Sequence, residues 1–389
     1  MLSLKLAIKN LMGAGLRTWL NVAVLSFAFV IIVFYNGMLD GWNLQAKMDT
    51  QNWEIGHGQL WHPEYDRYDP FSLQDAHAVI SPEIHTLVEN DRLTPILITQ
   101  AVAYTEGRMI NLQLKGIEPN QKILELPTQY LNSPSDEIGA MVGKRMAKSL
   151  RLKQGDQLLI RWRDKNGTFD AREITITEIF DSNVPTIDNG QLWIALKNLQ
   201  QMTGMANEAT YLVASETFSK EDIGFWEFVS QKTLLQEFDM IMQQKKGSSM
   251  IISGLLLAIA LLAIFDTQVL SIFRRQKEIG TYIALGMTRL QVVKIFTVEG
   301  GAHSLLALLV GAIYGIPLLL YLQNAGIPMP EYADDAGVAI SEKIIPAYSL
   351  GMLTTTTLLV IISATIVSYF PARRISKMKP TDAIKGKIQ

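Results

Sequence analysis

The chain has 389 residues, a formal net charge of −2 at pH 7 and no cysteine. A nearly neutral chain without a basic block excludes nucleic acid as the expected partner. The lack of cysteine excludes disulfides, cysteine-ligated zinc and thiol catalysis. Mean hydropathy is only slightly positive although four stretches are strongly apolar, so a large polar part must balance them.

The first residues predict an interfacial helix, which corresponds to the elbow helix of the family discussed below, followed by a membrane span. Residues 1–16 place leucines and isoleucine beside two lysines, a pattern typical of an amphipathic helix on the inner membrane surface. Residues 17–38 form the first span, because the apolar run from Trp19 to Met38 has the ~20 residues that cross a bilayer. A cleavable signal peptide is the alternative, but no small-x-small cleavage site with turn residues follows the run.

Residues 39–247 contain no further apolar run of that length and predict a soluble α+β domain on the far, periplasmic side. Alternating residues from Gln157 to Asp164, followed by Asn166-Gly167, predict a hairpin with Glu173–Phe180. A second hairpin is expected from Ile96–Tyr104 and Met109–Ile117, turned at Glu106-Gly107.

Helices are expected between and after these hairpins. The run GKRMAKSLRLKQGD predicts a helix ending near Gly155, and LKNLQQMTG predicts one ending at Gly204. Ser219 with Asp222 resembles a capping box and predicts the start of a stalk helix that continues to Gly247.

The second span, residues 248–273, begins directly after the stalk. Two helices stacked nearly end to end, about 54 residues at ~1.5 Å each, would make a lever of about 80 Å. We expect a bend at Gly247-Ser248-Ser249.

Residues 274–293 form a short basic segment between two membrane-length apolar runs, and short basic loops stay in the cytoplasm. Its apolar residues predict an amphipathic helix interrupted at Gly286, too short and too polar to enter the lipid. This pattern is expected of a segment that lies under the membrane and touches a soluble partner.

Two more spans complete the chain. The third, residues 294–322, is rich in glycine, which permits close helix contact. An acidic loop at 323–346 separates it from the fourth span at 347–370, and a basic tail follows at 371–389. The positive-inside rule therefore places both termini in the cytoplasm.

Ionisable residues inside the spans are Asp266, Glu299 and His303. Because a charge facing lipid is costly, we expect all three to face the helix bundle. An interhelical hydrogen-bond cluster is favoured over a substrate or proton role. Our hypothesis is that Asp266 and Glu299 help transmit movement of the basic segment.

Catalytic chemistry is not expected. Gly143-Lys144 lacks the earlier glycine and the hydroxyl residue of a Walker A motif, so any hydrolysis of ATP with Mg must take place on another chain. Four histidines do not have zinc-site spacing, and surface or hydrogen-bonded roles are favoured. Three carboxylates are expected in a solvated turn rather than as a hydrolytic pair. The histidines are His57, His62, His77 and His85, and the carboxylates are Glu64, Asp66 and Asp69.

The run RRQKEIGTYIALGMTRLQV resembles the signature between the second and third membrane helices of the MacB, FtsX and LolC/LolE permease family, E-R-x-R-E-I-G-x-x-R-A-L-G-A-x-x-x-x-I. Arg274 replaces the usual Glu, and Asp266 takes the place of an Asn. The tail PARRISKMKPTDAI is similar to the family's ending. In that family the segment is the coupling helix that docks on an ATPase. The resemblance therefore implies coupling roles for Arg274, Arg275, Lys277, Glu278, Ile279, Gly280, Leu285 and Gly286.

The resemblance implies four transmembrane helices, a large α+β periplasmic domain after the first, and a MacB-like, mechanotransmission type of ABC permease in the bacterial inner membrane. The implied partners are two copies of an ABC ATPase, an identical or homologous second permease, membrane lipid, and a periplasmic chaperone or adaptor. The run VGKRMAKSLRLKQGDQLLIRW looks closest to the lipoprotein-releasing LolC/LolE type. Two alternatives stay open: a MacB-like peptide or antibiotic efflux permease, and an FtsX-like signalling permease that activates a cell-wall hydrolase.

A lipid-anchored substrate would require an apolar groove between the first two spans. Phe27, Phe34 and Trp42 are candidates for its lining. An aromatic belt at the membrane surface explains the same residues equally well.

Overall fold

The computed structural model describes residues 16–105, 107–132, 137–219, 223–328 and 343–377. The chain divides into two compact units. The first, called here the membrane unit, comprises residues 1–42, 242–327 and 345–389. The second, the sheet unit, comprises residues 43–241 and 328–344. The predicted elbow helix and most of the 323–346 loop lie outside the described residues.

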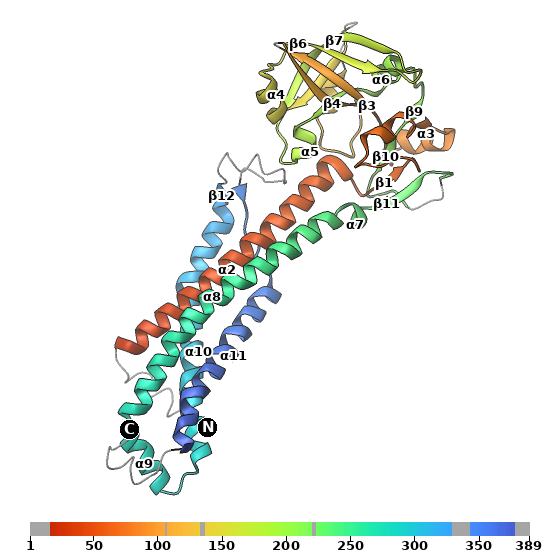
Figure 1. The fold of residues 1–389 in the computed structure, drawn as a ribbon. Coiled ribbons are helices and arrows are strands. Elements are labelled where there is room, and N and C mark those ends of the chain that lie inside the picture. The colour runs from red at the N-terminus through yellow and green to blue at the C-terminus, as the bar shows by residue number, and fades with distance from the viewer. Residues whose placement is uncertain (1–15, 106, 133–136, 220–222, 329–342, 378–389) are drawn as a thin grey trace. The chain divides into compact units, whose positions relative to one another are not determined.

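Four helices are long and apolar enough to cross a membrane by length and composition (Figure 1). They are α2 (Leu16–Thr50), α8 (Gln236–Arg274), α10 (Arg289–Ala325) and α11 (Leu350–Arg373). Each contains one of the four apolar runs recognised in the sequence. The first three extend well past the ~20 residues that a bilayer requires.

The membrane unit is held together by small residues and a few polar bonds. A Cβ on Gly315 would lie 2.7 Å from Val30, and one on Gly300 would lie 2.1 Å from the hydroxyl of Ser368. Glycine therefore lets α10 approach α2 at one point and α11 at another, as the sequence predicted. The amide of Asn21 donates to Thr267 at 2.6 Å, an interhelical bond that sets the register of α2 against α8.

The sheet unit is built on nine strands in the order β11-β1-β10-β3-β4-β8-β5-β7-β6. An additional pairing of β3 with β6 closes the six strands from β3 to β6 into a barrel (Figure 1). The barrel strands are β3 (Leu93–Thr105), β4 (Arg108–Ile117), β5 (Gly139–Gly143), β6 (Gln157–Arg163), β7 (Phe169–Phe180) and β8 (Gln191–Ala195). Strands β10 (Tyr211–Ala214), β1 (Gly58–Trp61) and β11 (Glu227–Ser230) extend the sheet beyond β3.

Alternation along the strands sends one set of side chains into the barrel and the other set outward. Leu112 and Leu114 of β4, for example, join the inner core, whereas Ile117 belongs to a separate core on the outer wall. Helices α4 (Lys144–Leu150) and α6 (Leu196–Thr203) add Met146 and Leu199 to the inner core. The barrel is thus a filled core with a second apolar layer outside it.

Both predicted hairpins are present. Strands β3 and β4 pair from Ile96↔Ile117 to Thr105↔Arg108. Strands β6 and β7 pair from Gln157↔Thr175 to Arg163↔Phe169, so β7 begins four residues earlier than Glu173, the predicted start. The predicted helix before Gly155 is shorter than expected, because Arg151 ends α4 in the left-handed conformation at φ 54°. Gly204 ends α6, as predicted, at φ 74°.

The predicted stalk helix is wrong in its first part. Ser219 is not helical, Asp222 lies outside the described residues, and residues 227–230 form β11, which pairs with β1. Helix begins only at α7 (Gln231–Leu234), where the Ser230 hydroxyl accepts from the backbone N–H of Thr233. Aromatic and β-branched residues, Phe228 and Val229, favour a strand at this point over a helix.

The bend expected at Gly247-Ser248-Ser249 is not marked by any break in the helix. Helix α8 runs without interruption through these residues, and the Ser249 hydroxyl donates to Asn36 of α2 at 3.0 Å. Packing against a neighbouring helix therefore overrides the low helix propensity of Gly and Ser. The uninterrupted helix has 39 residues, about 58 Å of helix instead of the predicted 80 Å.

The remaining elements are short. They are η1 (Gln51–Ile55), η2 (Pro70–Gln74), β2 (Ala78–Val79), α3 (Pro82–Glu89), η3 (Thr128–Leu131), α5 (Pro185–Asp188), β9 (Glu208–Ala209), α9 (Gln276–Ala284), β12 (Ile327–Pro328), β13 (Lys343–Ile344) and η5 (Arg374–Lys377).

Candidate functional site

The turn from α8 through α9 to α10 carries the predicted coupling residues. Gly286 follows α9 with φ 96°, a conformation that favours glycine. Thr288 then begins α10 with a capping box: its hydroxyl accepts from the N–H of Gln291, and the Gln291 side chain accepts from the N–H of Thr288 at 2.8 Å. The turn is therefore a defined structure and not a loose loop.

Arg275 lies at the centre of this turn. Its Nη1 donates to both carboxylate oxygens of Glu299, at 2.9 and 3.1 Å, and its Nε donates to Glu278 at 2.7 Å. The guanidinium also lies over the ring of Phe296, 4.8 Å from its centre. Charge-assisted bonds of this kind fix direction as well as distance. Arg275 thus links the start of α9 to the body of α10.

An apolar cluster, called here the turn core, lies beneath α9. Ile279 is fully buried in it, and the neighbouring Gly280 is also buried. These two predicted coupling residues therefore hold α9 in place and do not offer a surface to a partner. The turn core consists of Ile272, Ile279, Val292, Val293, Phe296, Ala372 and Ile375.

The exposed part of the turn, called here the apex, combines apolar and basic side chains. Leu285 is 78% exposed and Leu290 is 69% exposed, one on each side of the glycine turn. Lys277, Arg274 and Lys294 are exposed as well. Leucines held outward on a rigid turn amid positive charge make a surface suited to contact with a protein partner.

The three intramembrane groups do not form one cluster. Glu299 and His303 are each 5% exposed, and Nδ1 of His303 lies 2.9 Å from the carbonyl oxygen of Glu299. Asp266 is exposed on α8, so the prediction that it faces the bundle is wrong. The buried positions flanking it are Ile264 and Gln268, one turn apart, and a residue midway between them must point to the opposite side.

The predicted groove residues are not brought together. Phe27 is 61% exposed, whereas Trp42 is 8% exposed and has the ammonium of Lys245 above its ring at 4.4 Å. Phe34 is half-buried. Trp42 is thus a packing residue of α2 and α8, and only Phe27 offers an open aromatic face.

Residues 250–380 match the family model described as FtsX-like permease C-terminal. This segment contains most of α8, all of α9, the apex, α10 and α11. This match supports the MacB/FtsX/LolCE-type family of ABC permeases. No curated protein matches the chain. An ABC-type permease subunit with four apolar helices is a multi-pass membrane protein whose ATPase is a partner.

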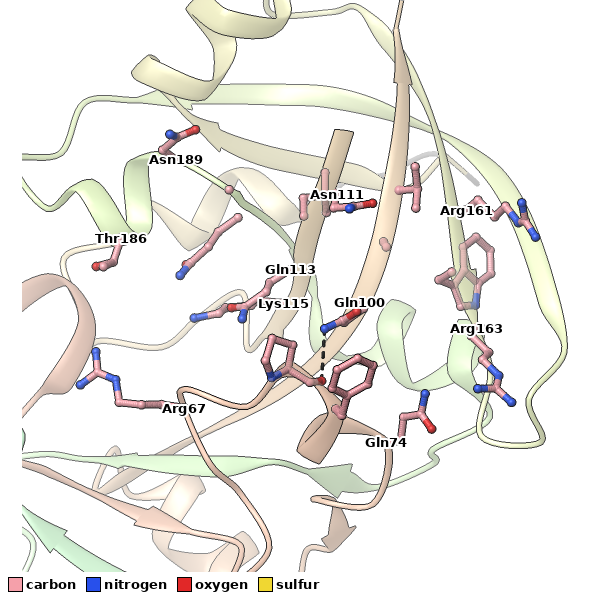
Figure 2. A pocket seen from close by; sticks show the side chains of 18 of the residues that line it. Arg67, Gln74, Gln100, Asn111, Gln113, Lys115, Arg161, Arg163, Thr186 and Asn189 are labelled. Atoms are coloured by element: carbon pink, nitrogen blue, oxygen red, sulfur yellow. Dashed lines mark hydrogen bonds between the residues drawn. The ribbon is translucent and has the colours of Figure 1, made fainter. Parts of the chain in front are cut away.

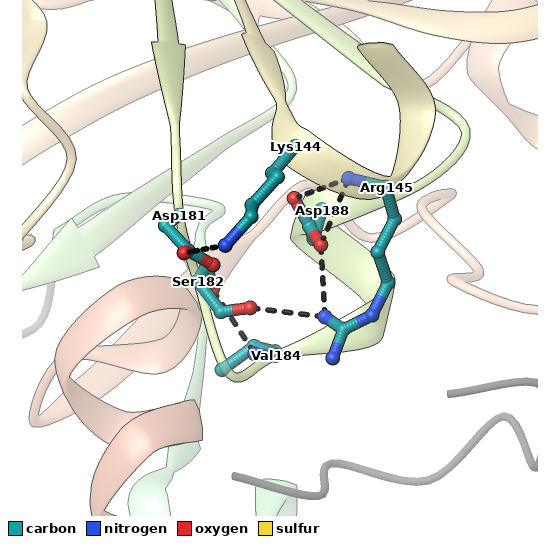
Figure 3. A network of polar contacts seen from close by, with 6 residues as sticks. All are labelled: Lys144, Arg145, Asp181, Ser182, Val184 and Asp188. Atoms are coloured by element: carbon teal, nitrogen blue, oxygen red, sulfur yellow. Dashed lines mark hydrogen bonds and ion pairs between the residues drawn. The ribbon is translucent and has the colours of Figure 1, made fainter. Parts of the chain in front are cut away.

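In this permease, Lys144, which follows Gly143, and Arg145 belong to a polar network in the sheet unit (Figure 3). Arg145 Nη1 donates to Asp188 at 2.8 Å and to the carbonyl oxygen of Ser182 at 3.0 Å, and Lys144 pairs with Asp181. The backbone N–H of Arg145 also donates to Asp188. Burial raises the pKa of the Asp188 carboxyl, although Arg145 opposes that shift. The start of α4 is therefore already occupied by a carboxylate of the same chain.

The histidines of the permease are hydrogen-bonded, as predicted. His77 pairs with Glu208, and Nε2 of His85 lies 2.7 Å from Asn207. The carboxylates near residue 66 have turn roles: Asp66 accepts from the N–H of Tyr68 at 2.8 Å, and Asp69 accepts from that of Phe71 at 2.9 Å. These contacts support the turn interpretation over a hydrolytic pair.

One feature of the permease escaped the sequence reasoning. A cavity of about 1000 Å³ lies in the sheet unit on the outer wall of the barrel (Figure 2). Its lining includes Gln113 and Lys115, which alternate with the core residues Leu112 and Leu114 in β4. The alternation in β4 predicts a hairpin but does not by itself indicate a cavity. Its outward set, Asn111, Gln113 and Lys115, was the available signal.

Proposed function

We propose that this chain couples ATP hydrolysis by a separate ATPase to movement of the sheet unit, in order to release a lipoprotein or another amphiphile at the outer face of the inner membrane. In this proposal two ATPase copies act on two permeases, identical or homologous. Both termini and the apex are cytoplasmic, and the sheet unit is periplasmic. ATP and Mg are bound by the ATPase, and a periplasmic chaperone or adaptor receives the cargo.

The observation that carries the proposal is the construction of the apex. Leu285 and Leu290 are exposed apolar side chains on a turn whose backbone is fixed by Gly286 and the Thr288 capping box. A rigid surface loses little conformational entropy when a partner binds. Basic residues around the leucines favour a partner surface that carries acidic side chains.

Transmission from the apex depends on Arg275. Because its guanidinium is bonded to Glu278 of α9 and Glu299 of α10, a displacement of α9 is carried directly into α10. The turn core extends this connection to α11 through Ala372. Helix α8, which enters the turn from the other side, is continuous over 39 residues. These features support a mechanical role, in which helices move as rigid rods.

The amphiphilic cargo is supported by the likeness of residues 142–162 to the LolC/LolE type. In the structure these residues form the end of β5, α4 and β6. On α2, Leu20 and Phe27 are 63% and 61% exposed, one above the other at a spacing of seven residues. A lipid chain could contact such an apolar stripe without displacing protein contacts.

The test is co-purification of the full chain with its ATPase from membranes. We expect the variant Leu285→Asp/Leu290→Asp to insert normally but to lose the ATPase. Leu350→Asp is the matched control, because Leu350 is 81% exposed at the start of α11, away from the turn. Equal recovery of the ATPase with both variants would refute docking at the apex.

The cargo is tested separately with the intact complex. Mass spectrometry of ligands retained during purification should detect acylated proteins, and ATP should reduce their amount. Retention of an adaptor with an outer-membrane channel, or of a cell-wall hydrolase, would instead argue against lipoprotein release.

A further inference from the structure

The cavity on the barrel wall is lined by the outward residues of several strands (Figure 2). Gln100 of β3, Gln113 and Lys115 of β4 and Gln191 of β8 all face it. Helix η2 covers one side, where the Gln100 amide donates to the carbonyl oxygen of Pro70 at 3.1 Å. Outward positions of neighbouring strands thus form a polar floor, whereas Ile96, Ile98 and Ile117 of β3 and β4 belong to the apolar core on the outer wall.

Lys115 is the unusual member of this floor. Its side chain is buried, with 4% of the residue exposed, and its ammonium lies 5.1 Å from the centre of the Trp193 ring. Within the described ranges, no acceptor lies within hydrogen-bond distance of Nζ. Burial lowers the pKa of Lys115 to about 8, so the group is mostly charged at neutral pH.

The nearby carboxylate does not neutralise Lys115 by direct contact. Glu54 accepts a hydrogen bond from the Thr186 hydroxyl at 2.8 Å, and one of its oxygens lies 3.7 Å from Arg67. Lysines this deeply buried are almost always paired, and Lys115 lines the cavity, where an anionic ligand could reach its ammonium. The cavity therefore contains a cation whose expected partner is not supplied by the described part of the chain.

The rest of the cavity lining also carries more positive than negative charge. Arg161 lies over the ring of Phe169 at 4.2 Å, and Arg163 is nearby on the same strand. The buried Oε1 of Gln191 has no hydrogen-bond partner within the described residues. Cations therefore outnumber the single carboxylate, and side-chain amides supply both donors and acceptors. The amides are those of Gln74, Gln100, Asn111, Gln113, Asn189 and Gln191.

We propose that this cavity binds a small organic carboxylate, with the carboxylate against Lys115 and its polar body against the surrounding amides. The amides favour a ligand that offers hydrogen-bond donors and acceptors over a bare inorganic anion, which would use only the cations. A volume of about 1000 Å³ lies at the upper end of the range of small-molecule sites. The inference is independent of the proposed transport function, because binding requires neither ATP nor a second chain.

The test is direct binding to the full chain in lipid nanodiscs. The probes are N-acetyl-trialanine and glucuronate, each compared with its neutral counterpart, the tripeptide amide and glucose. Inorganic phosphate is the third probe. We expect at least one acid to bind about tenfold or more tightly than its neutral counterpart, since pairing with a buried ammonium contributes 1.4 kcal/mol or more.

Two variants separate recognition from a structural role. Lys115→Met should lower affinity for the acid by about tenfold or more, while Lys197→Met, an exposed lysine on α6 outside the cavity, should leave it unchanged. Glu54→Gln should raise affinity several-fold, because it removes a competing negative charge and keeps a side chain that can accept from Thr186.

Three results would overturn the proposal. They are equal affinity for an acid and its neutral counterpart, binding of phosphate but of neither acid, and failure of every probe to bind. An unchanged affinity in Lys115→Met would do the same even if an acid binds. Loss of the ATPase from the apex variants would have no bearing on these outcomes, so the two proposals can fail separately.

Discussion

Two basic side chains in the two units are held in opposite ways. Arg275, in the turn between α8 and α9, donates to two carboxylates and lies over an aromatic ring. Lys115, on the barrel wall, has an aromatic neighbour but, among the residues that the structure describes, no hydrogen-bonded carboxylate. A buried charge with all its partners present fixes the geometry around it, whereas one without partners reduces stability. The first arrangement suits transmission of movement and the second suits recognition.

The largest effect is expected when the paired cation, Arg275, is removed. Arg275→Met leaves the buried carboxylate of Glu299 without its guanidinium, and such a loss costs about 3–5 kcal/mol. We expect the turn to open and ATPase stimulation to be lost. Hydrogen exchange of α9 and α10 in the full chain measures the first effect. Adding Glu299→Met should restore most of the exchange protection, and a double variant as unprotected as the single would contradict the pairing argument.

Removing the unpaired cation, Lys115, should have the opposite effect on stability. Lys115→Met should raise the free energy of unfolding of the sheet unit by about 3 kcal/mol at pH 7, because folding lowers the pKa of Lys115 from 10.5 to about 8. Between those two values the unfolded chain binds more protons, so wild-type stability should rise as pH increases from 8 to 10.5. The variant should lack that rise. Urea midpoints at several pH values are the measurement, and a destabilised variant would disprove the unpaired state.

A smaller effect is expected from Gly300→Ala, which leaves both Arg275 and Lys115 in place. A Cβ on Gly300 would lie 2.1 Å from the Ser368 hydroxyl, next to Glu299, whereas a Cβ on Gly254 would meet nothing within 4 Å. Gly300→Ala should therefore separate α10 from α11 at the ion pair and cost about 1–3 kcal/mol. Gly254→Ala is the control and should be neutral or slightly stabilising. Similar melting temperatures for the two variants would show that the close contact is unimportant.

The smallest effect concerns the apex backbone. Thr288→Ala removes the N-terminal cap of α10 and should cost about 1 kcal/mol, because the N–H of Gln291 loses its acceptor. We expect faster hydrogen exchange in the first turn of α10 with the Arg275 pairing unchanged. Thr288→Ser keeps the hydroxyl and should behave like the wild type. An equal change in both variants would mean that the hydroxyl is not the cause.

Sequence reasoning worked where the physical signal is local. Apolar runs of membrane length predicted four helices, and period-two alternation predicted both hairpins of the barrel. Sequence reasoning failed where contact with a distant segment of the chain determines the local structure. Strand β11 forms because β1 lies beside it, and α8 stays helical through Gly247 because α2 packs against it. Closure of the barrel by β3 and β6 links residues 55 to 61 positions apart and has no local signature.

The candidate site shows the same division. The glycine and the basic residues of the apex can be recognised in the sequence, but the burial of Ile279 and Gly280 depends on α10 and α11. The exposure of Asp266 follows from which face of α8 packs inward, which a single helix pattern with apolar residues on all sides does not specify. The cavity around Lys115 is formed by four segments that are distant in the sequence, and no rule of residue spacing predicts that they come together.

The extra pairing of β3 with β6 has a consequence for how the sheet unit resists mechanical tension. In a closed ring every strand has neighbours on both sides, so tension applied to one is shared through two ladders of hydrogen bonds. Within the described nine-stranded sheet, the outer margin of the extension is β11, only four residues long. Under repeated tension, such a domain would therefore expose no long unpaired strand edge at which neighbouring molecules could aggregate.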